Sequence, residues 1–300
     1  MSRRVFVTGA TGVIGRRVVP MLIEAGHSVT AVARSKAKAD AVRAAGATPV
    51  SLDVFDRAAV SAAIANHDCV AQLATHIPTG ASAARRSAWR TNDSLRRNAA
   101  AAIAAAAIEG GVGRLIQESI TFPYVDGGDQ WIDEQFERAY FWATRSAVDA
   151  ESAAASVTAA GGVGVVLRFA MFMAPDSAHI QSLVNAARRG LFAMIGAPES
   201  YTSLVHVDDA ATAVLAALDA PAGTYNVAEP DPVRRSSHRD ALATAVGQRR
   251  LRPMPHLVER AGGKAVASLA RSHRISSRHL CDVSPWVCTN HCVDKWKELA

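Results

Sequence analysis

The stretch Val5-Phe-Val-Thr-Gly-Ala-Thr-Gly-Val-Ile-Gly15 decides the fold of this 300-residue chain. It joins an apolar strand to three glycines that have the spacing of a turn over a phosphate. Gly9 permits the tight turn, Gly12 lets backbone amides approach a pyrophosphate, and Gly15 lets the following helix pack close to the strand. An anion in this turn lies on the helix N-terminus, where unpaired N–H groups and the helix dipole favour it. The stretch therefore predicts a dinucleotide site.

Strand and helix signals alternate beyond this turn, as a doubly wound parallel sheet requires. The expected strands are 4–8, 28–33, 48–52, 69–73, 114–118 and 164–169. The expected helices are 12–25, 36–45, 57–65, 87–109 and 143–160, followed by less regular sequence with helices at 179–189 and 207–220. We predict an α/β fold with a Rossmann-type doubly wound parallel sheet in residues 1–170, to which 206–225 return. Residues 171–205 and 226–300 are expected to form a smaller, discontinuous C-terminal substrate lobe.

Composition excludes several other classes of protein. A hydrophobic content of 49% suffices for one large domain with a lobe, and the longest apolar run, 99–108, is too short to cross a bilayer. The net charge of +6 includes arginines clustered between 85 and 97, without interleaved aromatics. This pattern favours a solvated helix face and anionic cofactors over nucleic acid. Cys281, Cys288 and Cys292 lack the paired C-x-x-C spacing, so we expect neither a metal site nor a disulfide framework in a cytoplasmic protein.

The motif Thr8-Gly9-x-x-Gly12-x-x-Gly15 resembles that of the extended and atypical short-chain dehydrogenase/reductases, the group that includes nucleotide-sugar epimerases and dehydratases. The likeness runs through most of the chain. The further motifs that carry it are Asp53-Val54, Leu73-Ala74-Thr75, Thr91-Asn92, Gln117-Glu118-Ser119, Leu167-Arg168-Phe169, His206-Val207-Asp208-Asp209 and Thr224-Tyr225-Asn226-Val227.

The end of the second expected strand bears on the choice of cofactor. An acidic residue there binds the ribose hydroxyls of NAD, but this chain has Arg34, whose guanidinium suits a 2′-phosphate. NADP is therefore favoured, and NAD remains the alternative. The resemblance adds an adenine-contacting pair after the third strand, a loop beneath the nicotinamide ribose and a helix residue facing the cofactor. The expected cofactor-binding residues are Gly9, Thr11, Gly12, Val13, Ile14, Gly15, Arg34, Asp53, Val54, Leu73, Ala74, Thr75 and Asn92.

The catalytic pair of the family is missing. The resemblance implies a serine or threonine after the fifth strand and a Tyr-x-x-x-Lys pair on the next helix, in which lysine lowers the tyrosine pKa. If Glu151 matches the glutamate four residues after that lysine, Ala143 and Ala147 replace the pair. If Tyr140 is the tyrosine instead, Thr144 stands at the lysine position.

Three other residues are candidates for catalysis. Ser119 follows the fifth strand and is expected to polarise a carbonyl, while Tyr124 or His76 supplies the proton. Their alternative roles are a turn cap for Ser119, packing or substrate binding for Tyr124, and lining of the cofactor site for His76. Asp208 or Asp209 is expected to cap the returning helix.

The sequence thus predicts an NADP-dependent oxidoreductase or epimerase/dehydratase-like enzyme that transfers hydride between the nicotinamide and a small carbonyl or hydroxyl substrate. The alternative is a non-catalytic NADP-binding sensor or regulatory protein, motivated by the missing tyrosine and lysine. The alanine-rich segments 87–109 and 143–160 offer small surfaces for packing, and relatives often dimerise through these helices, so a homodimer is expected. Neither nucleic acid nor a membrane is an expected partner.

Overall fold

The computed structural model describes residues 1–254 and 263–299. Its centre is a seven-stranded parallel sheet with the strand order β12-β7-β5-β4-β1-β2-β3. The chain runs outward from β1 to β3 and then returns to the other side of β1, so the order reverses between β1 and β4. In open α/β sheets, ligands bind at the carboxyl ends of the strands beside such a reversal. The strands are β1 (Arg4–Thr8), β2 (Ser28–Val32), β3 (Thr48–Val50), β4 (Cys69–Gln72), β5 (Arg114–Ile120), β7 (Val163–Phe169) and β12 (Gly223–Val227).

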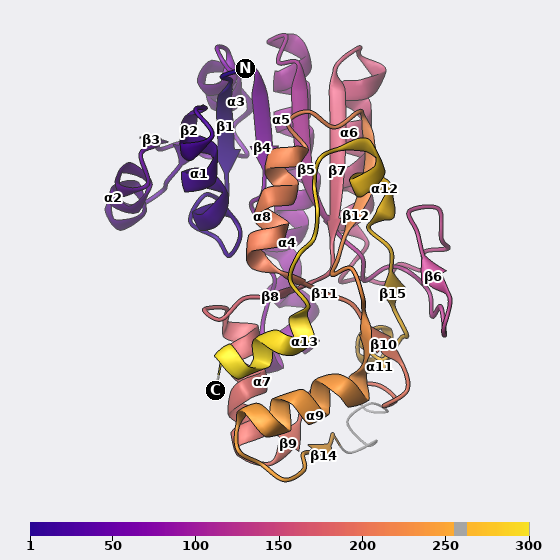
Figure 1. Cartoon of the computed structure of the whole chain (residues 1–300). Coiled ribbons are helices and arrows are strands. Elements are labelled where there is room, and N and C mark those ends of the chain that lie inside the picture. The colour runs from indigo at the N-terminus through magenta and orange to yellow at the C-terminus, as the bar shows by residue number, and fades with distance from the viewer. Residues whose placement is uncertain (255–262, 300) are drawn as a thin grey trace.

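Helices cover both faces of this sheet (Figure 1). One face carries α1 (Gly15–Glu24) and α8 (Val207–Ala216), which pack against each other. The other carries α3 (Arg57–Ile64), α5 (Ala100–Glu109) and α6 (Ser146–Ala159), while α2 (Lys36–Ala44) packs beside β3 at the sheet edge. The predicted Rossmann architecture is confirmed. The sheet also gains β12, a strand that the sequence pattern did not predict.

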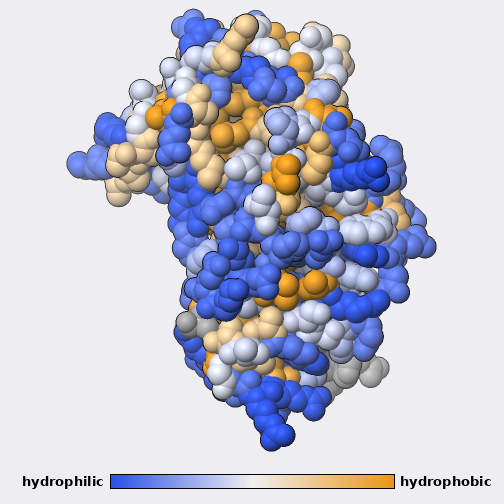
Figure 2. Space-filling model, in the orientation of Figure 1, coloured by the Kyte–Doolittle hydropathy of each residue, from blue (hydrophilic) through white to orange (hydrophobic). Residues whose placement is uncertain are grey.

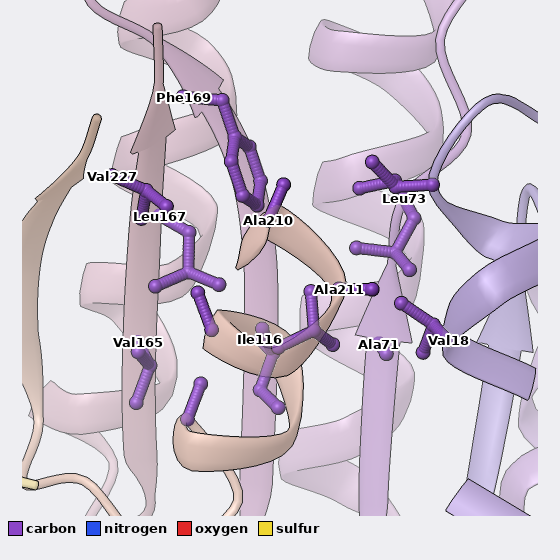
Figure 3. Packing of buried hydrophobic residues seen from close by; sticks show 14 of the residues in the cluster. Val18, Ala71, Leu73, Ile116, Val165, Leu167, Phe169, Ala210, Ala211 and Val227 are labelled. Atoms are coloured by element: carbon purple, nitrogen blue, oxygen red, sulfur yellow. The ribbon is translucent and has the colours of Figure 1, made fainter. Parts of the chain in front are cut away.

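The core beneath α8 is built largely from small and branched side chains. Ala210 and Ala211 of α8 lie among Ile116 of β5 and Leu167 of β7, and all four are buried (Figure 3). Alanine at these positions lets the helix lie close to the sheet, and Val18 of α1 fills the neighbouring space. The returning helix is therefore part of the main domain's core.

The predicted helix 87–109 is not one continuous α-helix. It consists of a short η2 turn (Arg86–Trp89), α4 (Arg90–Ser94), a π-helical turn η3 (Leu95–Ala99) and α5. Inside the π turn, the Arg96 side chain is only 1% exposed and pairs with Glu118 of β5 at 2.6 Å. Periodicity does not reveal a π turn, because one extra residue changes the hydrogen bonding without ending the helix.

A smaller lobe follows β7 and occupies the lower half of Figure 1. Its buried core includes Ile180, Leu183, Leu242 and Trp296, all from outside the large sheet.

The short strands outside the large sheet are β6 (Trp131–Ile132), β8 (Met171–Met173), β9 (Leu191–Phe192), β10 (Tyr201–Thr202), β11 (Leu204–His206), β13 (Val233–Arg234), β14 (Arg252–Pro253) and β15 (Arg274–Ile275). The remaining helices are η1 (Gly80–Ala84), α7 (Ala178–Arg188), α9 (Arg235–Ala245), α11 (Gly263–Leu269), α12 (Arg278–Val283), α13 (Cys292–Lys295) and η4 (Trp296–Glu298).

The C-terminal segment joins the two parts. Ile275, Leu280 and Trp286 pack in the core of the main domain, whereas Cys292 and Trp296 pack in the core of the lobe. Hydrophilic side chains cover most of the face shown in Figure 2, with apolar ones gathered near β4 and the upper end of α8. Within the described part of the chain, we find no helix long and apolar enough to span a membrane.

Candidate active site

The glycine turn between β1 and α1 is shaped by close backbone contacts. Gly9 has φ +72°, and a Cβ there would lie 2.7 Å from the backbone of Leu73 and Ala74. The Gly12 N–H donates to the Gly9 carbonyl at 2.9 Å and closes the turn. The N–H groups of Val13 and Ile14 donate no hydrogen bond within the described residues. Such unpaired donors before a helix fit the phosphates of a dinucleotide.

The other expected cofactor-binding residues lie in the loops that leave the same edge of the sheet. Arg34 follows β2, is exposed and has no ion-pair partner among the described residues. Asp53 follows β3 and accepts the N–H of Phe55 at 3.0 Å, while Val54 is buried. Ala74 and Thr75 follow β4 and are half-buried. Parallel strands thus bring all these segments to one edge.

Asn92 lies in α4 and is completely buried. Its Oδ1 accepts the His76 N–H at 3.0 Å, which fixes the loop after β4. Its Nδ2 has no partner among the described residues. A buried amide donor without a partner costs stability, so this group fits a site that a ligand or water completes.

Ser119 lies within β5 rather than in a loop after it. Its side chain is 0% exposed, and its hydroxyl donates to Glu151 Oε1 of α6 at 2.7 Å. Glu151 also accepts two hydrogen bonds from Arg168 of β7, at 2.8 and 2.7 Å. Burial alone would raise the pKa of Glu151, but the bonds from Arg168 outweigh it and lower that pKa. These contacts commit Ser119 to an internal ion-pair network.

Tyr124 also belongs to this network and not to an open cleft. It is 0% exposed, its hydroxyl donates to Asn226 Oδ1 at 2.8 Å, and the same hydroxyl accepts from Arg168 Nη1 at 2.8 Å. Burial raises the pKa of Tyr124, although the nearby Arg168 opposes the shift. The expected proton-donor role therefore lacks support, because the hydroxyl is paired on both sides inside the protein.

The positions of the missing catalytic pair are filled by packing. Ala143 and Ala147 are 1% and 0% exposed, and α6 begins at Ser146, three residues later than expected. Tyr140, the tyrosine of the other register, is half-buried, and burial raises its pKa. His76, the third catalytic candidate, is exposed in the loop after β4.

A cavity of about 100 Å³ lies where β5 and β7 end. Thr121 and Phe122 line it just beyond β5, and Met171 lines it just beyond β7. The lobe contributes the opposite wall, which includes His179, Met194, Tyr201, Arg235, Arg271 and His273. The sequence placed substrate specificity in this lobe but indicated none of these residues, because they come from separate segments without a shared spacing.

The motif at the returning helix serves the architecture, but not as predicted. His206, rather than either aspartate, is the N-cap of α8, and its Nδ1 accepts the Asp208 N–H at 3.4 Å. Asp209 instead accepts from Cys288 Sγ at 3.2 Å and from the Asn290 N–H at 2.9 Å. This carboxylate therefore fastens the C-terminal segment to the main domain.

Comparison with known proteins agrees with this arrangement. A family described as NAD(P)H-binding matches residues 9–221, which is more than half of the chain. The chain belongs to this family. Its fold is shared with proteins of the epimerase type. Such a family uses NAD(P), and the comparisons leave open which of the two forms this member prefers.

Two reductases are among the relatives of this family member. It is 30% identical over 267 residues to a 3-diazoavenalumate denitrifying reductase from Streptomyces sp, covering 84% of each chain. It is 27% identical over 254 residues to a 4-hydroxy-2-methyl-3-oxo-4-farnesyl-3,4-dihydroquinoline-1-oxide ketoreductase from Stigmatella aurantiaca, covering 81% of this chain and 73% of that protein.

Solved structures share the fold at lower identity. UDP-N-acetylglucosamine 4-epimerase from Bacillus cereus is 18% identical, with a TM-score of 0.77 and coverage of 99% of this chain and 98% of that one. The human epimerase family protein SDR39U1, solved with NADPH, has the same identity, TM-score and coverage. The chain thus shares the fold of these two proteins.

Proposed function

We propose that this chain is an NADPH-dependent reductase that transfers hydride to a small carbonyl-type substrate in the cavity beyond β5 and β7. The proposal rests on one observation: the glycine turn and this cavity lie on the same edge of the sheet. Both the turn, after β1, and the cavity, after β5 and β7, lie at carboxyl ends of parallel strands. The two relatives described above are named as reductases, which supports reduction as the reaction.

The residues around the turn fit the cofactor. The N–H groups of Val13 and Ile14 would bind the pyrophosphate with help from Thr11, and the three glycines would let it approach the backbone. The residues that would flank the adenosine and the nicotinamide ribose are Asp53, Val54, Leu73, Ala74, Thr75 and Asn92. When bound, NADPH supplies a hydride at this edge of the sheet.

Arg34 supports the preference for NADPH. It is exposed just after β2 and leads into Ser35, the N-cap of α2, whose side chain accepts the Lys38 N–H. A guanidinium with its donors open to solvent can donate two parallel hydrogen bonds to a 2′-phosphate. An NAD site instead has a carboxylate at this position.

A second candidate function is a non-catalytic sensor of NADP(H). One observation favours it: Ala143 and Ala147 leave the buried positions of the family's catalytic pair without a polar group. A sensor would keep the cofactor loops and lose turnover, as this arrangement of side chains allows.

Two measurements separate the candidates. Calorimetric titration with NADPH, NADH and their oxidised forms is expected to show tight binding of NADPH, and absence of binding to all four would overturn both functions. Anaerobic decay of NADPH fluorescence with a panel of aldehydes, ketones and quinones is expected to reveal at least one acceptor. Tight binding without any decay would establish the sensor.

A further inference from the structure

The cavity beyond β5 and β7 contains no carboxyl, lysine or cysteine side chain among its described lining residues. Reduction of an ordinary ketone produces an alkoxide, so an enzyme that performs it must place a proton donor beside the carbonyl oxygen. Whether any other group on this wall can be that donor decides which acceptors the site can reduce.

The two histidines of the wall are poor proton donors. Burial lowers the pKa of His273 to about 4, and its Nε2 lies 2.9 Å from the Tyr124 carbonyl. His179 is exposed at its surface, but desolvation of its ring also lowers its pKa, and its Nε2 lies 2.9 Å from Met171 Sδ. Both imidazoles are therefore neutral at pH 7, and each already faces a protein atom.

Several hydroxyl groups near this end of the sheet are also committed. The Ser119 hydroxyl donates to Glu151, and the Tyr124 hydroxyl donates to Asn226. The lining Thr121 hydroxyl faces the Phe169 carbonyl at 3.4 Å, and the lining Ser203 hydroxyl donates to the His273 carbonyl at 2.9 Å. These groups serve the fold rather than a reacting oxygen.

Three lining hydroxyls remain, on Tyr201, Thr202 and Ser268. That of Ser268 is aliphatic and too weak an acid to give up its proton. Thr202 Oγ1 is buried without a partner among the described residues, so it can bind a ligand oxygen, but an aliphatic hydroxyl is too weak an acid to give up its proton. The guanidinium groups of Arg234 and Arg274 lie over the Tyr201 ring, at 4.7 and 4.9 Å from its centroid. These contacts involve the ring of Tyr201 and not its hydroxyl, so the Tyr201→Phe variant tests whether that hydroxyl donates a proton.

The same wall carries cationic and aromatic groups. Arg271 donates to the carbonyls of Pro123 and Tyr124, and Arg235 adds a second guanidinium to the lining. The carbonyls that accept from Arg271 Nη1 are neutral, and the Asp126 carboxylate nearby offsets only part of the charge of the guanidinium, so Arg271 contributes a positive potential at the cavity. Phe122, Tyr201 and the two methionines of the lining add surfaces that suit an aromatic ring.

We propose that the hydride acceptor of this site is an anionic aromatic compound of the quinone type, whose reduction requires no proton from the protein. This inference rests on the proposed reductase function and names its substrate class. The acceptor takes two electrons and one proton as hydride from NADPH, which leaves NADP⁺, and the resulting hydroquinone anion takes its second proton from water. Arg271 attracts the anion, and such a substrate needs no proton from the side chains of the cavity.

The first test is binding, which needs no turnover. Calorimetry compares 2-hydroxy-1,4-naphthoquinone, which is anionic at neutral pH, with the uncharged 2-methyl-1,4-naphthoquinone. We expect at least a tenfold preference for the anion, reduced about tenfold in Arg271→Gln and retained in Arg271→Lys. Arg189→Gln, an exposed arginine at the end of α7, is the matched control and should change nothing. Equal affinity for both quinones would overturn the proposal.

The second test is anaerobic oxidation of NADPH by the anionic quinone and by 4-formylbenzoate, an anionic aldehyde. We expect oxidation by the quinone alone, slowed by deuterium at C4 of NADPH and unchanged in D₂O or in Tyr201→Phe. Faster oxidation by the aldehyde, a twofold slowing of the quinone reaction in D₂O, or its loss in Tyr201→Phe would overturn the proposal and leave the reductase standing. No oxidation by either acceptor, or by the wider panel, would overturn the reductase itself.

Discussion

The two halves of the sheet's carboxyl edge differ in how they use polar groups. Beyond β1, β2 and β4, the N–H groups of Val13 and Ile14, the Arg34 guanidinium and Asn92 Nδ2 have no partner among the described residues. At the ends of β5 and β7, the Ser119 hydroxyl and the Arg168 guanidinium both donate to the Glu151 carboxylate of α6. The polar groups of the first half are free to bind a ligand, whereas those of the second half are paired within the protein.

We infer from this difference that a fold can keep its cofactor site while the catalytic positions become structural. A buried polar group must be paired, and it can pair with a ligand or with the protein. In this chain, which lacks the Tyr-x-x-x-Lys pair in either register, Ser119 and Arg168 both pair with Glu151. Four substitutions test this comparison, and their expected effects on the folded protein decrease from Glu151 to Arg34.

Glu151→Ala should have the largest effect. It removes the carboxylate that accepts from Ser119, Arg138 and Arg168 and leaves the Arg168 guanidinium, with its side chain 4% exposed, buried without its partner. We expect a loss of about 3 kcal/mol or more in the free energy of unfolding, measured with urea. Asp149→Ala on the same helix breaks only the exposed pair with Arg97 and should cost about 0.5 kcal/mol. Similar costs for both would refute the structural role of the network.

Gly9→Ala should follow closely. Positive φ costs an alanine about 1–2 kcal/mol, and the added Cβ would lie 2.7 Å from the backbone after β4. We expect about 3 kcal/mol of destabilisation in total and loss of NADPH binding by calorimetry. Gly26→Ala is the control, since Gly26 also has positive φ but has nothing within 4 Å of its Cβ position. Intact NADPH binding in Gly9→Ala would exclude the turn as the phosphate site.

Glu229, two residues beyond β12, should make stability depend on pH. It accepts the N–H groups of Leu204 and Cys292 and is 1% exposed, and burial raises its pKa to about 7. Because the folded state holds the proton more tightly than the unfolded state, this group's contribution falls as pH rises from about 4.5 to about 7.

The measurement is urea unfolding of wild type and Glu229→Gln at pH 5 and pH 8. Glutamine resembles the protonated carboxyl at both pH values. Relative to wild type, the free energy of unfolding of the variant should therefore be about 2–3 kcal/mol more favourable to the folded state at pH 8 than at pH 5. An unchanged difference would show that Glu229 titrates alike in the folded and unfolded states.

Arg34→Glu should have the smallest effect on the folded protein and a selective one on binding. The side chain is exposed, so stability should change by less than about 0.5 kcal/mol. Replacing the cation by an anion should weaken the binding of NADPH at least about tenfold, while the binding of NADH stays unchanged or becomes tighter. Lys38→Glu, exposed on α2, is the control. Equal weakening of NADPH binding and NADH binding would show that Arg34 does not bind the 2′-phosphate.

The sequence predicted the elements whose signals are local. The glycine turn, six of the seven sheet strands to within two residues, and helices such as α2 and α3 follow from spacing, caps and apolar periodicity. The π turn at Arg96 and the extension of β5 through Ser119 and Ile120 did not. Both bring polar side chains to partners on other elements, which local patterns do not encode.

By itself, the sequence determined the dinucleotide-type turn and the absence of Tyr-x-x-x-Lys, because each depends on residue types at fixed short spacings. Only the tertiary structure decided what Ser119 and Tyr124 bind, since their partners Glu151 and Asn226 lie 32 and 102 residues away. It also decided that His206 caps α8 and that Asp209 holds the C-terminal segment. Short spacing dictates backbone geometry, whereas the partner of a buried polar group is chosen only when distant segments pack and water is excluded.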